Sequence, residues 1–496
     1  MNRSKLRFNA LLTECITLLK MYLEKLNLKK TLLSALLLSS LYSCSDDPTP
    51  NTDPYQALAT YQEGEENLID DLSISSTSNN AFGKEIPGLS SLDKLRFASG
   101  NSLFNQSWVS APASTSGLDG LGPTFNSRAC ASCHFKDGRG KPFEPSNIGS
   151  KGFLIRLSIP GKDPHGGPLP VPSYGDQLQN HSNLGIPKEA NINVAFEYID
   201  EKYPDGTPYQ LRKPIYTFSD ENFGSLSGVL FSPRIGQQII GLGLVDALPD
   251  SEILKNVDEF DADNDGISGK ANYVWDAINN TTALGKFGWK SNQPSLKQQT
   301  AGALFGDLGL TTSIFSGNPC PSPQKDCYDA PNGGSPEVTD KQMDRFMLYQ
   351  SSLAVPKRRN YKAPEVLKGK VAFHKLKCVS CHATNFKTDT YAFNPLLSNK
   401  TIHPFSDFLL HDMGEGLADN RPDFLADGRE WRTQPLWGIG LIKTVNKHTF
   451  LLHDGRARNI EEAILWHGGE AEKSKNEFKK LSKTEREHLI AYIESL

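Results

Sequence analysis

Two short stretches of the chain, Cys130-Ala-Ser-Cys-His134 and Cys378-Val-Ser-Cys-His382, place two thiols and an imidazole at one fixed spacing. This Cys-x-x-Cys-His pentad is the attachment signature of c-type haem. The thiols of Cys130 and Cys133, and those of Cys378 and Cys381, can form thioether bonds to haem vinyl groups, and the adjacent histidine can bind the iron. One pentad alone could be a zinc half-site or a redox dithiol. Because the chain has two pentads and no further Cys-x-x-Cys to complete a zinc site, we predict two covalently bound haem c groups.

The first 80 residues are typical of an exported lipoprotein. The apolar run Leu32–Leu41 follows Lys29-Lys30 and is too short to span a bilayer, which favours a signal peptide. Its end, up to Cys44, resembles a bacterial lipobox, so we expect a lipid anchor on Cys44. Met21 is an alternative start, because the basic segment lies far from Met1. Ser45-Asp46-Asp47 is similar to the acidic tag of surface lipoproteins; we expect an outer-membrane or periplasmic location, with the cell surface as the alternative.

The composition limits the partners. The net charge is −4, which gives no indication of a nucleic-acid partner. The chain has 496 residues, enough for two or three domains. It has 41 Gly, 31 Pro and only 38% hydrophobic residues, so we expect a loop-rich protein whose core includes large apolar cofactors.

The middle region contains a candidate disulfide and a candidate calcium loop. Cys320 and Cys327 lie in a loop rich in Gly, Pro and Ser, and in an exported protein we interpret them as a disulfide, with two reduced thiols as the alternative. Asp261, Asp263 and Asp265, followed by Gly266, resemble the first half of a calcium loop. The twelfth position is Asn272 in place of the usual Glu, so the alternative is a solvated turn.

A duplicated pattern organises the expected fold. Gly100-x-x-x-Phe104 precedes the first pentad and Gly369-x-x-x-Phe373 precedes the second, which indicates an internal duplication with an insertion in the first copy. Ser482-Lys-Thr-Glu485 is a capping box that begins a terminal helix. We expect a mainly α protein with long loops and a few short strands, containing two cytochrome c-like haem domains. The expected divisions are a signal peptide (1–43), a flexible tether (44–80), an N-terminal cytochrome c-like haem domain (81–245), a loop-rich middle region (246–355) and a C-terminal cytochrome c-like haem domain (356–496).

The C-terminal half resembles the bacterial di-haem cytochrome c peroxidase superfamily. The segment from Leu452 to Ala463 is similar to the His-Asp-Gly…Leu-Glu-Glu-Ala signature that follows the second haem in those proteins. Within the superfamily, the chain is most similar to the di-haem oxidoreductase branch, also labelled thiol oxidoreductase-like. Phrases shared with that branch occur from about residue 91 to 496, and they include Gly120-Leu-Gly-Pro-Thr-Phe-Asn126, Asp137-Gly-Arg-Gly140, Phe287-Gly-Trp-Lys290, Leu409-Leu-His-Asp-Met-Gly414 and His467-Gly-Gly-Glu470.

The resemblance implies axial ligands for the second haem. In the peroxidases the residue fourteen positions after the His of His-Asp-Gly is the second ligand of the electron-transfer haem, usually Met. Counting from His453 gives His467, so the implied pair is His382 and His467. Replacing Met by His removes a ligand that raises the potential, so we expect a lower potential. Met413 is the rival ligand, and an ordinary surface histidine is the other interpretation of His467.

For the first haem the resemblance implies an open or switchable iron bound by His134. His165 and His181 are weaker candidates for a sixth ligand. The peroxidases also use a Gln and a Glu to move the peroxide proton. Gln237 and Asp246 are our candidates for that pair, against the alternative of a surface Gln and a helix-terminal Asp. Trp289 and Trp437 are candidates for a position between the haems, or else ordinary core residues.

We therefore expect a peroxidase-like di-haem oxidoreductase. The C-terminal haem would take electrons from a donor protein or a quinol-linked chain. The N-terminal haem would react with a small oxidant, with hydrogen peroxide as the default. The alternatives are an electron-transfer cytochrome without catalysis, and a maturation enzyme that oxidises side chains of another protein.

Overall fold

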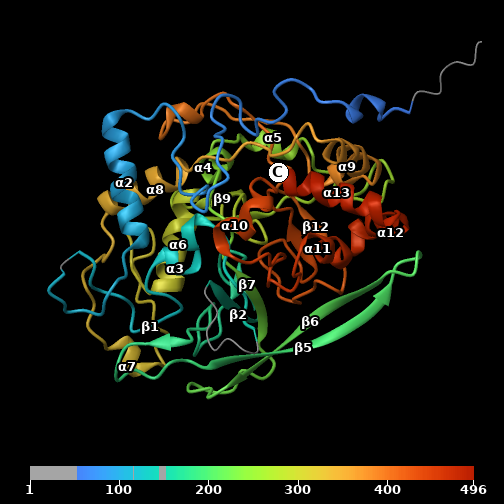
Figure 1. Cartoon of the computed structure of the whole chain (residues 1–496). Coiled ribbons are helices and arrows are strands. Elements are labelled where there is room, and N and C mark those ends of the chain that lie inside the picture. The colour runs from blue at the N-terminus through green and yellow to red at the C-terminus, as the bar shows by residue number, and fades with distance from the viewer. Residues whose placement is uncertain (1–52, 116, 145–151) are drawn as a thin grey trace, which may run out of the picture. The chain divides into compact units, whose positions relative to one another are not determined.

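Two pairs of crossed helices support the segments that carry the pentads. The computed structural model describes residues 53–115, 117–144 and 152–496. In it, α2 (Ser91–Asn105) packs on α8 (Asp340–Ser351), and α9 (Pro364–Lys375) packs on α13 (Lys483–Ser495) (Figure 1). Since α2 precedes the first pentad and α9 precedes the second, each pentad follows one helix of a pair.

Both pairs cross at a glycine. A Cβ atom on Gly100 would lie 2.3 Å from the carbonyl oxygen of Arg345 in α8. A Cβ atom on Gly369 would lie 2.0 Å from the carbonyl oxygen of His488 in α13. These distances leave no room for a side chain, so the two helices of each pair touch backbone to backbone.

One turn after each glycine, a phenylalanine contacts a tyrosine of the partner helix. The ring centroids of Phe104 and Tyr349 are 5.4 Å apart, and those of Phe373 and Tyr492 are 5.3 Å apart. Each tyrosine lies four residues after the carbonyl that the glycine approaches. The predicted duplication is therefore present in three dimensions and includes both helices of each pair.

The chain contains far more strand than we expected. It is 28% helical and 19% strand, with several small sheets, so the prediction of a mainly α protein with cytochrome c-like domains is wrong. The longest strands are β5 (Asn191–Lys202) and β6 (Pro208–Ser219), which form the long antiparallel hairpin in Figure 1. β2 (Phe153–Lys162) lies between β3 (Pro168–Leu169) and β7 (Leu230–Ile235). β-branched and aromatic residues in the middle region favour these strands.

Apart from α6 and α12, the remaining elements are short. Residues Tyr55–Leu496 form one compact unit. The other α-helices are α3 (Cys130–Cys133), α4 (Leu242–Asp246), α5 (Asp250–Leu254), α6 (Leu296–Leu308), α7 (Lys325–Tyr328), α10 (Ile442–Asn446), α11 (Ile460–Trp466) and α12 (Glu472–Lys480). The other strands are β1 (Thr124–Phe125), β4 (His181–Ser182), β8 (Tyr273–Asp276), β9 (Thr281–Leu284), β10 (Phe386–Lys387), β11 (Thr401–Ile402), β12 (Leu410–Asp412) and β13 (Glu430–Arg432).

The predicted signal peptide and Cys44 lie outside the described residues. Within the segment assigned to the tether, Leu68, Ile69 and Leu72 are buried, and Ile69 forms a β-bridge with Ile402. These residues therefore pack against the folded unit. Over the part of the chain that the structure describes, no helix has the length and apolarity needed to cross a bilayer.

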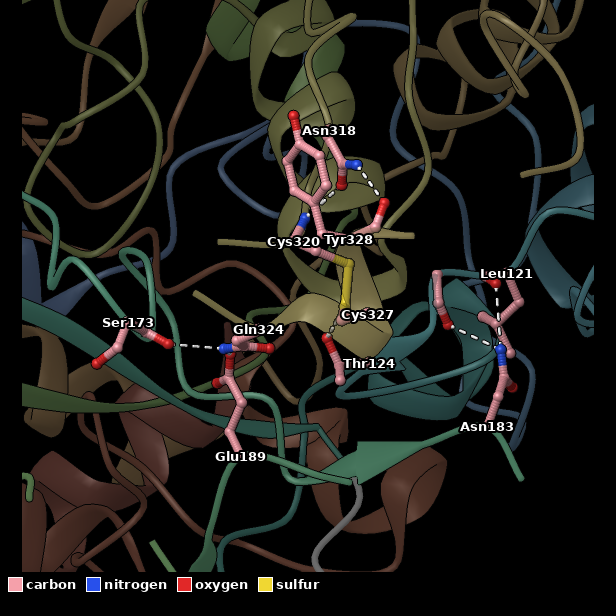
Figure 2. Close-up of a disulfide and its surroundings, with 11 residues drawn as sticks. Leu121, Thr124, Ser173, Asn183, Glu189, Asn318, Cys320, Gln324, Cys327 and Tyr328 are labelled. Carbon is pink, nitrogen blue, oxygen red and sulfur yellow. Dashed lines mark hydrogen bonds between the residues drawn. A yellow bond between two sulfur atoms is a disulfide. The ribbon is translucent and has the colours of Figure 1, made fainter. Parts of the chain in front are cut away.

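A disulfide fastens the loop before α8. Cys320 and Cys327 are joined and buried, and the Cys327 sulfur lies 3.4 Å from the hydroxyl of Thr124 in β1 (Figure 2). Between the two cysteines, the Gln324 amide donates to the carbonyl of Ser173 at 2.8 Å and to the Glu189 carboxylate. The loop thus supports the insertion that precedes the first pentad.

Candidate haem sites

The first pentad ends in a histidine whose orientation is fixed by a backbone carbonyl. The Nδ1 atom of His134 lies 2.6 Å from the carbonyl oxygen of Gln237. Because a carbonyl only accepts, Nδ1 carries the proton and Nε2 keeps its lone pair for a metal. Burial lowers the pKa of His134, which favours the neutral form that binds metals. The imidazole lies 6.3 Å from the ring of Phe104 in α2.

The second pentad repeats this arrangement. The Nδ1 atom of His382 donates to the carbonyl of Phe405 at 2.9 Å, and its ring lies 6.2 Å from the ring of Phe373 in α9. Burial lowers the pKa of His382 to about 4, so the imidazole is neutral at physiological pH. Each helix pair thus presents one neutral imidazole, with Nε2 free, beside its two cysteines.

An apolar cavity of about 200 Å³ lies in front of the second pentad. His467 lines this cavity together with His382, and its Nδ1 donates to the carbonyl of Ala463 in α11 at 2.6 Å. His467 therefore also has Nε2 free. Met413 lines the same cavity, so the structure brings both rival ligands to it. Most of the wall is apolar and includes Phe373, Leu376, Leu417, Trp431, Leu436, Ile439, Leu451, Ile460, Ile464, Phe478, Leu489 and Ile493.

Glu470 anchors the turn that follows His467. Its carboxylate accepts from the His411 ring at 2.7 Å and from the Ser268 hydroxyl at 2.8 Å. The other ring nitrogen of His411 donates to Asp407 at 2.8 Å. Burial alone would lower the pKa of His411, but the Asp407 carboxylate, which accepts a ring N–H, raises it above its usual range. This charged contact gives the phrase His-Gly-Gly-Glu a structural role.

The two candidates for proton transfer lie in different surroundings. Gln237 holds His134 through its backbone, and its side-chain oxygen accepts from Arg432 at 3.3 Å. The carboxylate of Asp246 accepts from the Leu296 backbone N–H at 2.8 Å and from the Tyr391 hydroxyl at 2.6 Å. Burial raises the pKa of Asp246. Gln237 and Asp246 share no hydrogen-bond partner within the described ranges.

A different glutamine–carboxylate pair lies beside the first pentad. Asp307, at the end of α6, accepts from the Gln177 amide at 2.7 Å. Its charge acts on both thiols of the first pentad and on the imidazole of His134. Burial raises the pKa of Asp307, and the charge of Arg156 opposes that increase. Neither residue was predicted from the sequence.

Backbone contacts from the insertion before the first pentad hold Asp307 in place. The backbone N–H groups of Asn126 and Ser127 donate to the carbonyl of Asp307 at 2.9 and 3.1 Å. Asn126 ends the phrase Gly120–Asn126, in which a Cβ on Gly122 would lie 2.6 Å from the Cα of Gly309. The insertion before the first pentad therefore fixes the end of α6 and with it the carboxylate.

A model of the family described as "di-haem oxidoreductase, putative peroxidase" matches residues 71–496. The chain belongs to this family. Neither the curated proteins nor the solved structures that were compared contain a match. Membership supports haem binding and a general oxidoreductase role.

The geometry fits the two haems of this di-haem oxidoreductase family. Each pentad offers a neutral imidazole beside two thiols. At the second pentad, His382 and His467 line one largely apolar cavity, which suits a flat apolar macrocycle with iron at its centre.

Trp289 contacts both the segment that holds His134 and the cavity of the second pentad. Its indole N–H donates to the carbonyl of Ile235 at 2.9 Å, two residues before the carbonyl that holds His134. Its ring also lines the cavity of the second pentad. Trp437 is buried, and a Cβ on Gly241 would lie 2.5 Å from its ring.

The predicted calcium loop gathers carboxylates in a different combination. Asp258, Asp261 and Asp263 have oxygen atoms within 4.8 Å of one another. Asp265 lies 3.6 Å from the ammonium of Lys377, next to the second pentad. The amide of Asn272 donates to two backbone carbonyls elsewhere, at 2.7 and 3.0 Å. Calcium binding through Asp261, Asp263 and Asp265 remains a prediction.

The two histidines considered for the sixth position of the first haem are exposed. His165 stacks on Trp275 with ring centroids 4.0 Å apart. His181 stacks on Phe125 at 5.9 Å.

Proposed function

We propose that the chain is a peroxidase-type enzyme with haem c attached at both pentads. The supporting observation is the difference between the two sites. The second site brings His382 and His467 to one cavity, as a six-coordinate electron-transfer haem requires. At the first site, Asp307 and Gln177 form a hydrogen-bonded carboxylate–amide pair, and the charge of Asp307 acts on the imidazole of His134. An iron with a proton-carrying group beside it suits catalysis, and an iron between two imidazoles suits electron transfer.

The first site would reduce hydrogen peroxide. Peroxide reduction to water consumes two electrons and two protons, so the site needs a group that delivers protons. The bound haem supplies the redox chemistry. His134 would bind the iron through Nε2, and its Nδ1–H bond to the carbonyl of Gln237 fixes the ring. Asp307 would hold and release the proton, because burial raises its pKa. Gln177 would orient that carboxylate through its amide N–H.

Electrons would enter at the second haem. We propose a donor protein or a quinol-linked chain as the source, and an exported lipoprotein anchored through Cys44 as the form that meets it. Trp289 spans the distance between the His134 segment and the second cavity, which supports a short electron route from the second haem to the first.

Replacing Asp307 by Asn in the enzyme that contains both haems tests the proposal. General acid–base catalysis contributes about 10² to 10⁴ in rate, so D307N should lower kcat/KM for peroxide by that factor. Glu189→Gln is a matched control, since Glu189 is a buried carboxyl that accepts from Gln324 and has its pKa raised to about 8 by burial. E189Q should keep its activity.

Spectroscopy separates the enzyme from a carrier. The oxidised or half-reduced protein should show high-spin iron by electron paramagnetic resonance, and a pyridine haemochrome assay should count two haems. Low-spin iron alone in every redox state, together with no peroxide turnover, would identify a simple electron-transfer cytochrome and refute the proposed enzyme.

A further inference from the structure

Two buried arginines line the second cavity, and the structure shows no ion pair for either within the described residues. Arg139 and Arg432 are 6% and 5% exposed, and both belong to the cavity wall. Other buried arginines pair with carboxylates: Arg234 lies 3.0 Å from Asp423. Arg139 and Arg432 therefore differ from an ordinary buried arginine of this chain.

Arg432 is held entirely by neutral acceptors. Its guanidinium donates to the carbonyls of Gly288 and Lys286 at 2.8 and 3.0 Å. It also donates to the side-chain oxygens of Gln434 and Gln237 at 2.7 and 3.3 Å. Burial lowers the pKa of Arg432 to about 9, and the charge of Asp407 opposes that decrease only in part.

Arg139 makes fewer hydrogen bonds through its side chain than Arg432 does. It donates to Gln238 and to the carbonyl of Leu452, both at 3.3 Å, and its Nε has no partner among the described residues. Its guanidinium lies 5.4 Å from the ring centroid of Trp289. Burial lowers the pKa of Arg139 to about 10.

A buried charge without a counter-charge is strongly destabilising, so a pair of such charges in one apolar wall indicates an anionic ligand. A haem carries two carboxylates, the propionates, on an otherwise apolar ring. Arginine binds carboxylates through parallel N–H donors. The two positive charges of the arginines would balance the two negative charges of the propionates.

We propose that Arg139 and Arg432 bind the propionates of the second haem and set its reduction potential. This inference rests on the proposed presence of a haem at Cys378 and Cys381. Two positive charges at the ring edge stabilise the added electron, so they raise the potential. They would oppose the lowering that an imidazole at His467 causes relative to a thioether.

The same arginines are connected to the first site. Gln237 and Gln238 are consecutive, and their side chains accept from Arg432 and Arg139 respectively. The backbone carbonyl of Gln237 holds His134. One short segment therefore orients both arginines at the second haem and the imidazole of the first.

Spectroelectrochemical titration of the two-haem protein tests the assignment, with Arg139→Gln and Arg432→Gln measured separately. Loss of one charge-assisted contact should lower the one-electron equilibrium constant of the second haem about tenfold, which is about 59 mV. R432K should keep most of the wild-type potential because it keeps the charge. Arg359→Gln is a matched control: Arg359 has a pKa lowered to about 10 by burial, but it donates to the carbonyl of Glu494 and does not line the cavity.

The propionate bending bands in the resonance Raman spectrum give an independent readout, and they should shift in R139Q and R432Q but not in R359Q. If R432Q fails to take up haem, R139Q and R432K still decide the question. Unchanged potentials in R139Q and R432Q with two haems bound would overturn the proposal, as would a shift confined to the first haem. A count below two haems in the wild-type protein would instead refute the proposed function.

Discussion

Replacing Gly369 by alanine should break the contact between α9 and α13 that supports the second haem site. The added Cβ would lie 2.0 Å from the carbonyl oxygen of His488 and 2.7 Å from the Cβ of Tyr492. A backbone carbonyl cannot rotate away as a side chain can, so the helices must separate. Overpacking costs about 1–3 kcal/mol, and we expect the upper end. Alanine regains about 1 kcal/mol of helix propensity. The net expected loss is about 2 kcal/mol.

Gly302 provides the matched control, because it also lies inside a helix. A Cβ on Gly302 in α6 would meet its nearest neighbours, Gln293 and Phe315, at 3.9 Å, which is ordinary contact. G302A should therefore gain about 1 kcal/mol from helix propensity alone. The two variants should differ by about 3 kcal/mol in the free energy of unfolding, measured by urea denaturation of the haem-containing protein. G369A should also disturb the absorbance of the second haem, since Phe373 contacts both Tyr492 and His382.

Equal unfolding free energies for G369A and G302A would refute the backbone contact as the basis of the helix pair. G100A tests the same contact in the other helix pair, where the added Cβ would lie 2.3 Å from the carbonyl oxygen of Arg345. It should affect the first haem and leave the second unchanged. A common effect of G100A and G369A on both haems would contradict the assignment of one helix pair to each site.

Three further predictions concern single sites. His467→Met should raise the potential of the second haem and introduce a weak far-red charge-transfer band; that band in the wild type would identify Met413 as the ligand. A calcium chelator should lower the melting temperature, and Asp261→Asn should abolish the effect, whereas a wild type insensitive to chelator would exclude structural calcium. Burial raises the pKa of Asp137 from 3.8 to about 7, so the folded protein retains a proton that the unfolded chain releases. Asp137 should therefore make the free energy of unfolding fall as pH rises through that window, by up to about 1.4 kcal/mol per unit, and urea titrations of Asp137→Asn should show a slope that is smaller by that amount.

The sequence predicted best where chemistry depends on residue type at a short spacing. The pentads, the capping box at Ser482 and the duplicated Gly-x-x-x-Phe are local patterns, and the structure contains the capping box and the duplicated contacts. The tyrosines of the partner helices escaped notice, because Tyr349 and Tyr492 lie far from the glycines along the chain. Only the folded chain shows that each tyrosine has the same place in its pair.

The strands were underestimated for a physical reason. The hairpin of β5 and β6 is only half buried, and in β5 only Ile192 is fully buried. The strand signal is nevertheless present in the sequence, because the apolar residues Ile192, Val194, Phe196 and Tyr198 occupy alternate positions along β5. The resemblance to a haem family therefore outweighed the local signal, and the mainly α prediction followed.

The proposed proton-transfer pair could not be predicted from the sequence, because its members meet only in the fold. Asp307 and Gln177 are 130 residues apart, and neither lies within a pentad. Gln237 was chosen for its side chain, yet its carbonyl is the group that holds His134. Every residue type has a backbone carbonyl, so this contact cannot be predicted from the type of residue at position 237. The side chains of Gln237 and Gln238, which accept from Arg432 and Arg139, do depend on residue type. Their role could not be predicted, because the cavity that the two arginines line is formed by segments far apart in the chain.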